Sequence, residues 1–203
     1  MSIRAMTIAD VPAVVHVHME AFPNFFLTFL GRGFLRELYR GIVRDPSGIA
    51  FVAERDGAIS GFVAGTYEPA GLYRRLLKRR LIPFAWHAGW AFLRKPTAAP
   101  RLLRALTKSK SAASSEGRRA ELMSLAVLPG NRGGGTGARL VETFVDSARN
   151  HGAATVFLTT DAMHNDAVND FYVRLGFVRS RGFTTPEGRA MNEYEKSSME
   201  KTR

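Results

Sequence analysis

A short glycine-rich segment is the part of this sequence best suited to chemistry. Residues 132–137 read Arg-Gly-Gly-Gly-Thr-Gly, between a run typical of a β-strand and a run typical of a helix. Glycine has no Cβ, so a ligand can approach its backbone closely. The first N–H groups of any helix also lack partners within the helix and can bind a ligand. The partial positive charge at a helix N-terminus favours an anion. The segment therefore predicts a site for a phosphate-bearing ligand, although glycine-rich turns also occur simply to reverse the chain.

Two familiar phosphate-binding patterns can be compared with this segment. A P-loop requires Lys followed by Ser or Thr after its last glycine, and neither follows Gly137. Gly133, Gly135 and Ala138 do satisfy the G-x-G-x-x-A spacing of a dinucleotide-binding turn. Asp161 also ends the next predicted strand, where an acid would bind a ribose. Too few residues follow Asp161 to complete a doubly wound sheet, however, and a short spacer separates the first strand from the turn.

Composition bounds the class of protein. The chain has 203 residues, of which 45% are hydrophobic and 23% are charged, so we expect one globular domain over residues 1–203. It contains no cysteine, which excludes disulfides, thiolate zinc sites and a cysteine nucleophile. The five histidines have no metal-ligand spacing, so we expect no metal. The sequence begins without a signal-peptide pattern and has no apolar run of about 18 residues, and we expect a cytoplasmic protein.

The positive charge is concentrated in one segment. The chain has a formal net charge of +11, and residues 70–119 hold 13 Lys or Arg against one acid, Glu116. Aromatic residues such as Tyr73, Trp86 and Trp90 alternate with these cations. We interpret residues 70–119 as a basic, partly helical insert in an otherwise near-neutral domain. Such an insert could bind an anionic acceptor, nucleic acid or an anionic membrane surface, or could simply pack on the domain.

The elements that must position the turn are helices and strands in alternation. Apolar residues recur at helical spacing in some segments and alternate in others, and Asp56-Gly57 marks a hairpin. The predicted helices run from Asp10 to before Pro23, from Gly31 to Arg44, from the glycine-rich turn to Asn150, and from Asn165 to Leu175. The predicted strands are residues 3–4, Ile49–Glu54, Ala58–Tyr67, Ala120–Leu128, Ala154–Thr160, Phe177–Arg179 and Met191–Glu195. This order predicts an α+β (mixed α/β) domain around one central sheet.

Two motifs together resemble the GCN5-related N-acetyltransferase (GNAT) superfamily. Residues 125–129, the Arg132–Gly137 turn and the following helix resemble its acyl-coenzyme A signature, R/Q-x-x-G-x-G/A. Residues 165–177, Asn-Asp-Ala-Val-Asn-Asp-Phe-Tyr-Val-Arg-Leu-Gly-Phe, resemble its second signature, N…FY…GF. The resemblance covers about residues 2–69 and 120–195. It implies a mostly antiparallel twisted sheet flanked by helices, with the basic insert between the third and fourth strands.

The resemblance implies that the chain binds acetyl-CoA. In the family the amides of the turn bind the pyrophosphate of coenzyme A, and the preceding strand binds its pantetheine arm. Val127 would also donate a hydrogen bond to the thioester oxygen, which stabilises a developing oxyanion. Asn165 matches an Asn that contacts the cofactor, although it could simply be the N-cap of the last helix. The residues that the resemblance assigns to the cofactor are Leu125, Ala126, Val127, Arg132, Gly133, Gly134, Gly135, Thr136, Gly137, Ala138, Asn165 and Tyr172.

The resemblance also implies two catalytic residues. Tyr172 matches the tyrosine that protonates the departing thiolate, and the alternative is an ordinary packed aromatic residue. Glu121 is our candidate for the base that deprotonates the acceptor, and the alternative is a surface carboxylate at the end of a strand. Glu121 lies six residues before Val127, and strict alternation predicts both side chains on one face. The lesser candidates are Glu20, Glu68 and Asp161.

We therefore expect an N-acetyltransferase that moves the acetyl group directly from acetyl-CoA to a primary amine, because no cysteine is available for an acyl-enzyme. A basic insert beside the site would suit a small anionic acceptor such as a nucleotide-linked amino sugar. The alternatives are a protein N-acetyltransferase, or a GNAT-fold module that binds nucleic acid or a membrane surface through residues 70–119. In the membrane case the enzyme would be peripheral. The oligomeric state is open, with a dimer among the options.

Overall fold

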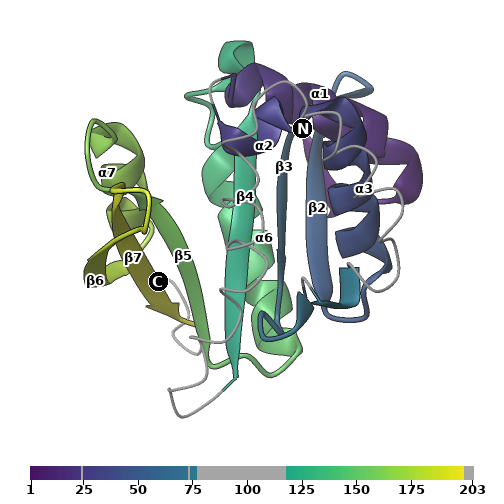
Figure 1. Ribbon diagram of the computed structural model, residues 1–203. Coiled ribbons are helices and arrows are strands. Elements are labelled where there is room, and N and C mark those ends of the chain that lie inside the picture. Colours follow the sequence, from purple (N-terminus) through teal and green to yellow (C-terminus); the bar gives the residue numbers. More distant parts are fainter. Residues whose placement is uncertain (24, 73, 77–117, 199–203) are drawn as a thin grey trace.

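The computed structural model describes residues 1–23, 25–72, 74–76 and 118–198 (Figure 1). These residues form one seven-stranded sheet in the order β1-β2-β3-β4-β5-β7-β6. The strands are β1 (Ser2–Ala5), β2 (Gly48–Arg55), β3 (Ala58–Thr66), β4 (Arg119–Val127), β5 (Thr155–Asp161), β6 (Val178–Thr184) and β7 (Ala190–Ser197). The helices are α1 (Val11–Ala21), α2 (Phe26–Phe29), α3 (Gly31–Arg44), α6 (Thr136–Asn150) and α7 (Asp166–Arg174), with short 3-10 turns η1 (Ile8–Asp10) and η4 (Pro129–Asn131). No helix in these ranges is long and apolar enough to cross a membrane.

The structure confirms the predicted fold class and the predicted order of elements. Among the described strands, β4 and β5 pair in parallel and all other neighbours pair antiparallel. The sequence pattern does not indicate α2, and it ends β6 at Arg179 rather than Thr184. Most of β6 is exposed at the edge of the sheet, so it lacks the apolar alternation by which a strand is recognised. Most of the predicted insert, residues 77–117, lies outside the described residues, and its helices stay a prediction.

Helices cover both faces of the sheet. Phe62 and Val63 are neighbours on β3, so their side chains point to opposite faces. Phe62 packs in a buried cluster with residues of α1 and α3, such as Tyr39. Val63 packs in a second cluster with Phe144 of α6 and Tyr172 of α7. The sheet therefore has an α1/α3 side and an α6/α7 side.

The central strands β4 and β5 pair only at their first residues. Their parallel register joins Arg119–Glu121 to Thr155–Phe157, whereas β4 continues to Val127 and β5 continues to Asp161. Figure 1 shows green β5 leaning away from teal β4 beyond this point. No described strand pairs with the β5-facing edge of β4 after Glu121. Among the described residues, the sheet thus presents a free backbone edge just before the glycine-rich turn.

A β-bulge interrupts β4 and changes which residues share a face. The register between β3 and β4 skips Met123, so Met123 is the extra residue. Strict alternation would put two residues an odd number of positions apart on opposite faces, yet Leu122 and Val127 both pack on the α6/α7 side. Met123 packs on the α1/α3 side. The strict alternation expected from the sequence is therefore wrong, because the bulge reverses the side-chain direction partway along the strand.

The first described residues of the insert are part of the core. Leu72 and Leu76 are buried, and a Cβ built on Gly41 of α3 would lie only 2.5 Å from Leu76 Cδ2. Arg75 forms a bidentate ion pair with the buried Asp45, with distances of 2.9 Å from Nε to Oδ2 and 3.1 Å from Nη2 to Oδ1. These residues therefore belong to the domain and cannot be removed together with the rest of the insert.

Candidate active site where β4, α6 and α7 meet

The glycine-rich turn leads directly into α6. Gly135 is the N-cap of the helix with φ 74°, and Gly133 has φ 85°, a backbone region that glycine adopts most readily. No side chain of the described residues caps the first turn of α6, so its early N–H groups remain available to a ligand. A Cβ built on Gly133, Gly134 or Gly135 would meet no atom within 4 Å. The turn is thus an open backbone surface at the N-terminus of a 15-residue helix.

Packing brings the second motif to the start of α6. A Cβ built on Gly137 would lie 3.4 Å from the ring of Phe171 and 3.9 Å from Val127 Cγ2. Phe171 belongs to α7 and Val127 ends β4, so the three elements meet at this point. Arg132 Nε also donates a hydrogen bond to the carbonyl of Val127 at 3.3 Å. The structure therefore brings together the turn, the strand before it and the helix that carries Tyr172.

Tyr172 is a buried residue of α7 with 6% of its surface exposed. Its ring packs edge-on against Phe171 and Phe177, with ring centroids 5.1 Å and 5.6 Å away. Burial raises the pKa of the Tyr172 hydroxyl above its usual value. The phenol therefore keeps its proton over the whole physiological pH range, which is the form that a general acid requires.

Two asparagines fix α7 to the diverging end of β5. The backbone carbonyl of Asn165 accepts hydrogen bonds from the N–H groups of Val168 and Asn169, so Asn165 is the N-cap residue, but its side chain does not cap the helix. Its Nδ2 donates instead to the carbonyl of Asp161 at 3.3 Å. Asn169 is buried, accepts a bond from Thr160 Oγ1 at 2.6 Å and donates to the same Asp161 carbonyl at 3.2 Å. The sequence signature gives Asn169 no role, although its spacing of four residues from Asn165 could have indicated that both side chains lie on one face of the helix.

Glu121 lies on the opposite face of β4 from Val127. Its neighbour Leu122 packs on the α6/α7 side, so the side chain of Glu121 points to the α1/α3 side. The prediction that Glu121 and Val127 share a face is wrong, because the Met123 bulge lies between them. Glu121 is the last residue of β4 that pairs with β5, and it lies opposite Phe157. A base at this position would reach a thioester held along β4 from the face opposite α6.

Other charged residues lie on the same face of the sheet as Glu121. Arg119 lies 4.3 Å above the ring of Phe157 and 3.2 Å from the carboxylate of Glu193, and Arg181 is 2.8 Å from the same carboxylate. Burial opposes ionisation of Glu193, but hydrogen bonds from Arg181 and Arg119 outweigh it and lower its pKa. Arg119 is therefore bound within the sheet, although it belongs to the segment interpreted as the basic insert.

The lesser base candidates have less suitable surroundings. Asp161 is paired with Arg189 at 2.6 Å, and Glu68 lies 3.8 Å from Arg75. Glu20 is exposed on α1, which packs on β3 and β4. Within residues 1–23, 25–72, 74–76 and 118–198, no group of three or more His, Cys, Asp or Glu side chains could hold a metal ion.

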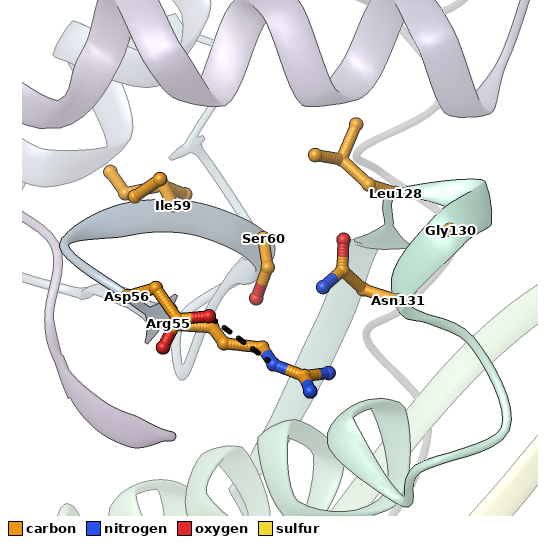
Figure 2. Close-up of a pocket in the computed structure, with 8 residues that line it drawn as sticks. Arg55, Asp56, Ile59, Ser60, Leu128, Gly130 and Asn131 are labelled. Atoms are coloured by element: carbon orange, nitrogen blue, oxygen red, sulfur yellow. Dashed lines mark ion pairs between the residues drawn. The ribbon is translucent and has the colours of Figure 1, made fainter.

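A cavity of about 340 Å³ lies beside η4 and is distinct from this site. Figure 2 shows Ser60 of β3 and Asn131 of η4 pointing toward each other across it, with Arg55 of the β2–β3 hairpin alongside. Arg55 pairs with Asp56 at 3.7 Å. None of the residues assigned to the cofactor lines this cavity.

The described residues fit a substrate that combines a pyrophosphate with an extended amide-bearing arm. The open turn and the uncapped start of α6 supply backbone donors for the phosphates. The free edge of β4 supplies peptide groups that can bond to the amides of the arm. Both features lie at the same end of β4, so one elongated molecule can use both.

Comparison with known proteins agrees with this geometry. The model of the acetyltransferase (GNAT) family matches residues 12–177. No curated protein matches the chain. The ribosomal-protein-S18-alanine N-acetyltransferase from Escherichia coli has a TM-score of 0.60 and 15% identity, over 99% of this chain and 96% of that chain. Two aminoglycoside acetyltransferases cover 100% of both chains: a 6'-acetyltransferase of type Ii (TM-score 0.65, 14% identity) and a 6'-N-acetyltransferase complexed with coenzyme A (0.64, 13%). At these identities the structural likeness shows the fold.

Proposed function

Because the chain belongs to the acetyltransferase (GNAT) family and is an acyl-CoA-dependent N-acetyltransferase, we propose that it acetylates the primary amine of a small molecule. The observation that carries this proposal is the meeting of three elements at Gly137, where Val127 and Phe171 converge. This arrangement supports the proposal because it brings together the glycine-rich turn, the edge of β4 that no described strand pairs and the helix that carries Tyr172. Direct transfer follows because the chain has no cysteine to form an acyl-enzyme.

The co-substrate, acetyl-CoA, binds with its pyrophosphate against the turn and its arm along β4. The backbone amides of residues 133–138 donate to the phosphate oxygens, as the uncapped start of α6 favours. Leu125, Ala126 and Val127 offer peptide groups on the free edge of β4. Asn165, at the start of α7, contacts the arm from the other side.

The transfer needs a neutral amine and a place for the leaving group. Glu121 accepts a proton from the acceptor ammonium, directly or through water, because an alkylammonium with a pKa near 10 is almost wholly protonated at pH 7. The nitrogen lone pair then attacks the thioester carbon, and the Val127 N–H donates to the oxyanion. When the C–S bond breaks, the electron pair stays on sulfur, and Tyr172 donates a proton to it as the negative charge develops. The acetylated nitrogen loses its second proton, which returns to Tyr172. The products are the acetamide and free coenzyme A, with one proton released through Glu121.

The acceptor approaches from the α1/α3 side, since the cofactor occupies the α6/α7 side. Two of the described arginines of residues 70–119 are already paired, Arg75 with Asp45 and Arg119 with Glu193. Recognition of an anionic acceptor by this segment therefore depends on its other cations. The structural neighbours are named for a protein alanine and for aminoglycosides, so both a peptide and an amino sugar belong among the acceptors to be tested.

A mass-spectrometric screen tests the proposal. The protein is incubated with acetyl-CoA and a library of primary amines that includes amino sugars, nucleotide-linked amino sugars, aminoglycosides and peptides with a free N-terminus. We expect a mass increase of one acetyl group on a small-molecule amine, together with release of one thiol per product. Acetylation of peptides alone would replace the small-molecule proposal with a protein acetyltransferase. Thiol release without any acetylated amine would contradict amine transfer altogether.

A further inference from the structure

The helix that carries Tyr172 also contains a buried asparagine that the proposed mechanism does not use. Asn169 lies about one helical turn before Tyr172 on α7 and has 9% of its surface exposed. Its Oδ1 accepts a hydrogen bond from Thr160 Oγ1 at 2.6 Å, and its Nδ2 donates to the carbonyl of Asp161 at 3.2 Å. Both partners lie on the part of β5 that no longer pairs with β4. Asn169 therefore joins the helix of Tyr172 to the diverging end of the strand.

The stability of the fold does not explain an asparagine at this position. Asn is a poorer helix former than Leu, and a buried amide loses its bonds to water when the chain folds. Leu has the same branching as Asn and needs no polar partner. The neighbouring strand shows that polar groups are not always satisfied here. Asn192 of β7 pairs with Thr160 and is 7% exposed, and within the described residues its Oδ1 has no hydrogen-bond partner. A role in the reaction explains Asn169 better than stability does.

The position of the Tyr172 hydroxyl depends on the position of α7. The ring packs against Phe171 of the same helix and against Phe177, whose N–H donates to the carbonyl of Tyr172 at 3.0 Å. Both aromatic neighbours are local, so they move together with the helix. Tyr172 also belongs to the apolar cluster on the α6/α7 side of the sheet, but apolar packing has no preferred direction. Directional bonds between α7 and the sheet are needed to fix where the hydroxyl lies.

Among the described residues, side-chain hydrogen bonds attach α7 to the sheet at its start, in its middle and just after its end. At the start, Asn165 donates to the carbonyl of Asp161. After the end, Lys196 of β7 donates to the carbonyl of Leu175 at 2.6 Å, but its long, flexible stem lets the helix move. In the middle, Asn169 is short and buried, and it uses both its donor and its acceptor. It is therefore the contact best able to fix the helix against β5.

We propose that Asn169 is a positioning residue, which holds α7 against the end of β5 so that the Tyr172 hydroxyl stays within reach of the departing sulfur. The inference rests on the proposed function, in which Tyr172 protonates the thiolate. A general acid needs hydrogen-bond contact with the atom that takes its proton, and a displacement of about 1 Å can lower the rate about 100-fold. The two bonds of Asn169 oppose such a displacement. The glycine-rich turn and the free edge of β4 belong to other elements, so binding of the cofactor should depend little on Asn169.

A paired substitution tests this role. Thr160→Val and Asn169→Leu together replace the two bonded side chains by apolar ones of similar shape, and the Asp161 carbonyl keeps its bond from Asn165. We expect Tm to change by less than about 4 °C, because neither side chain of the pair leaves a polar group unpaired. With n-butylamine or a better amine from the screen as the acceptor, kcat for thiol release should fall about tenfold, while the KM for acetyl-CoA stays within about twofold. The control is Asp170→Leu, at an exposed position of the same helix, which should keep kcat within about twofold.

The same paired substitution in the Tyr172→Phe background separates positioning from general support of the fold. If Asn169 acts through the Tyr172 hydroxyl, the substitution lowers kcat no further in this background. Losses that multiply would overturn the inference, as would an unchanged kcat when Tyr172 is present or an equal loss in Asp170→Leu.

A second variant keeps the test valid if the paired variant does not fold. Thr160→Val alone removes one bond of Asn169 and keeps the bond to Asp161. It should lower kcat about threefold, again with no further loss in the Tyr172→Phe background, and a loss that multiplies there would overturn the inference. Failure of the proposed function has a different signature, because the wild-type protein would then transfer no acetyl group to n-butylamine or to any amine of the screen.

Discussion

At the scale of single residues, Tyr172 combines a core position with a hydroxyl that burial keeps protonated. A protonated phenol can assist a departing thiolate only while the C–S bond breaks, because full transfer of the proton to sulfur runs against the raised pKa of Tyr172. Tyr172→Phe keeps the ring, which packs against Phe171 and Phe177, and deletes only the hydroxyl. We therefore expect kcat to fall about 100-fold while the KM for acetyl-CoA changes less than twofold, as measured by thiol release. A kcat within twofold of the wild-type value would mean that solvent protonates the leaving group.

His18 makes the stability of the fold sensitive to mild acid. Its pKa is about 4 in the folded state, because burial penalises the imidazolium, and about 6.5 in the unfolded chain. Between these values the unfolded state binds more protons, so stability falls as pH falls. From pH 7 to pH 5 the loss should be about 2 kcal/mol in the free energy of unfolding. Denaturant unfolding of His18→Leu should show a smaller loss over this range.

The matched control is His16, which is exposed on the same helix. His16→Leu should keep the full loss between pH 7 and pH 5. If the two variants lose stability equally, His18 titrates normally and the account of its buried neutral ring is incorrect.

At the scale of elements, the sequence correctly predicts a helix or a hairpin wherever the pattern that identifies it lies within that element. The apolar spacing of Leu140, Val141 and Phe144 predicted α6, and these residues are buried on it. The same holds for the hairpin at Asp56-Gly57, which joins β2 and β3. Both signals lie within one element or one turn, and no distant part of the chain has to be known to interpret them.

The sequence does not predict side-chain directions or contacts that depend on how neighbouring elements pack together. The bulge at Met123 is set by the register between β3 and β4, so strict alternation placed Glu121 on the wrong side relative to Val127. The contact between His18 and Tyr39 joins two helices whose faces could be predicted but whose mutual position could not. The turn and the helix of Tyr172 were predictable as motifs, and only the fold shows that they meet.

The ion pair of Arg75 and Asp45 is an element-scale feature that can be tested directly. The Asp45 carboxylate is buried beside α3, and Ser47 supplies further hydrogen bonds to it. Arg75→Met leaves this carboxylate without its cation, so we expect a loss of about 3 kcal/mol, or about 6–12 °C in Tm. Thermal unfolding measures the shift. The neighbouring Arg74 is exposed, and Arg74→Met should change Tm by no more than about 2 °C; equal shifts in the two variants would contradict a buried pair.

At the scale of the whole molecule, the insert and the glycine-rich turn are connected to opposite ends of β4. The insert enters β4 at Arg119, and the turn follows Val127 at the other end. Replacing residues 78–116 by a short Gly/Ser linker keeps the core residues Leu72, Arg75 and Leu76. We expect coenzyme A affinity to stay within about twofold, because closing a loop of this kind costs little entropy. A larger deletion that began at Leu72 would remove part of the core.

The same deletion separates the roles that the basic insert could have. If the insert recognises the acceptor, as we predict, the KM for the acceptor found in the amine screen rises while coenzyme A still binds. Unchanged kinetics together with lost binding to anionic vesicles or to nucleic acid would show that the insert is an anchor and not part of the acceptor site. Loss of coenzyme A binding by a folded protein would contradict the separation of the insert from the cofactor site.

The central claim is that acetyl-CoA binds on the backbone of the glycine-rich turn, and calorimetry with coenzyme A tests it most directly. Gly134 and Gly130 both lack a positive φ, and a Cβ on either meets no atom within 4 Å, so Val at either position should leave the fold intact. Gly134 lies in the turn, whereas Gly130 lies outside it in η4. We predict a micromolar Kd for the wild-type protein, a Kd weakened at least about tenfold in Gly134→Val because the side chain occupies the phosphate position, and a nearly unchanged Kd in Gly130→Val. Equal affinity in folded Gly134→Val and wild-type protein would show that coenzyme A binds elsewhere.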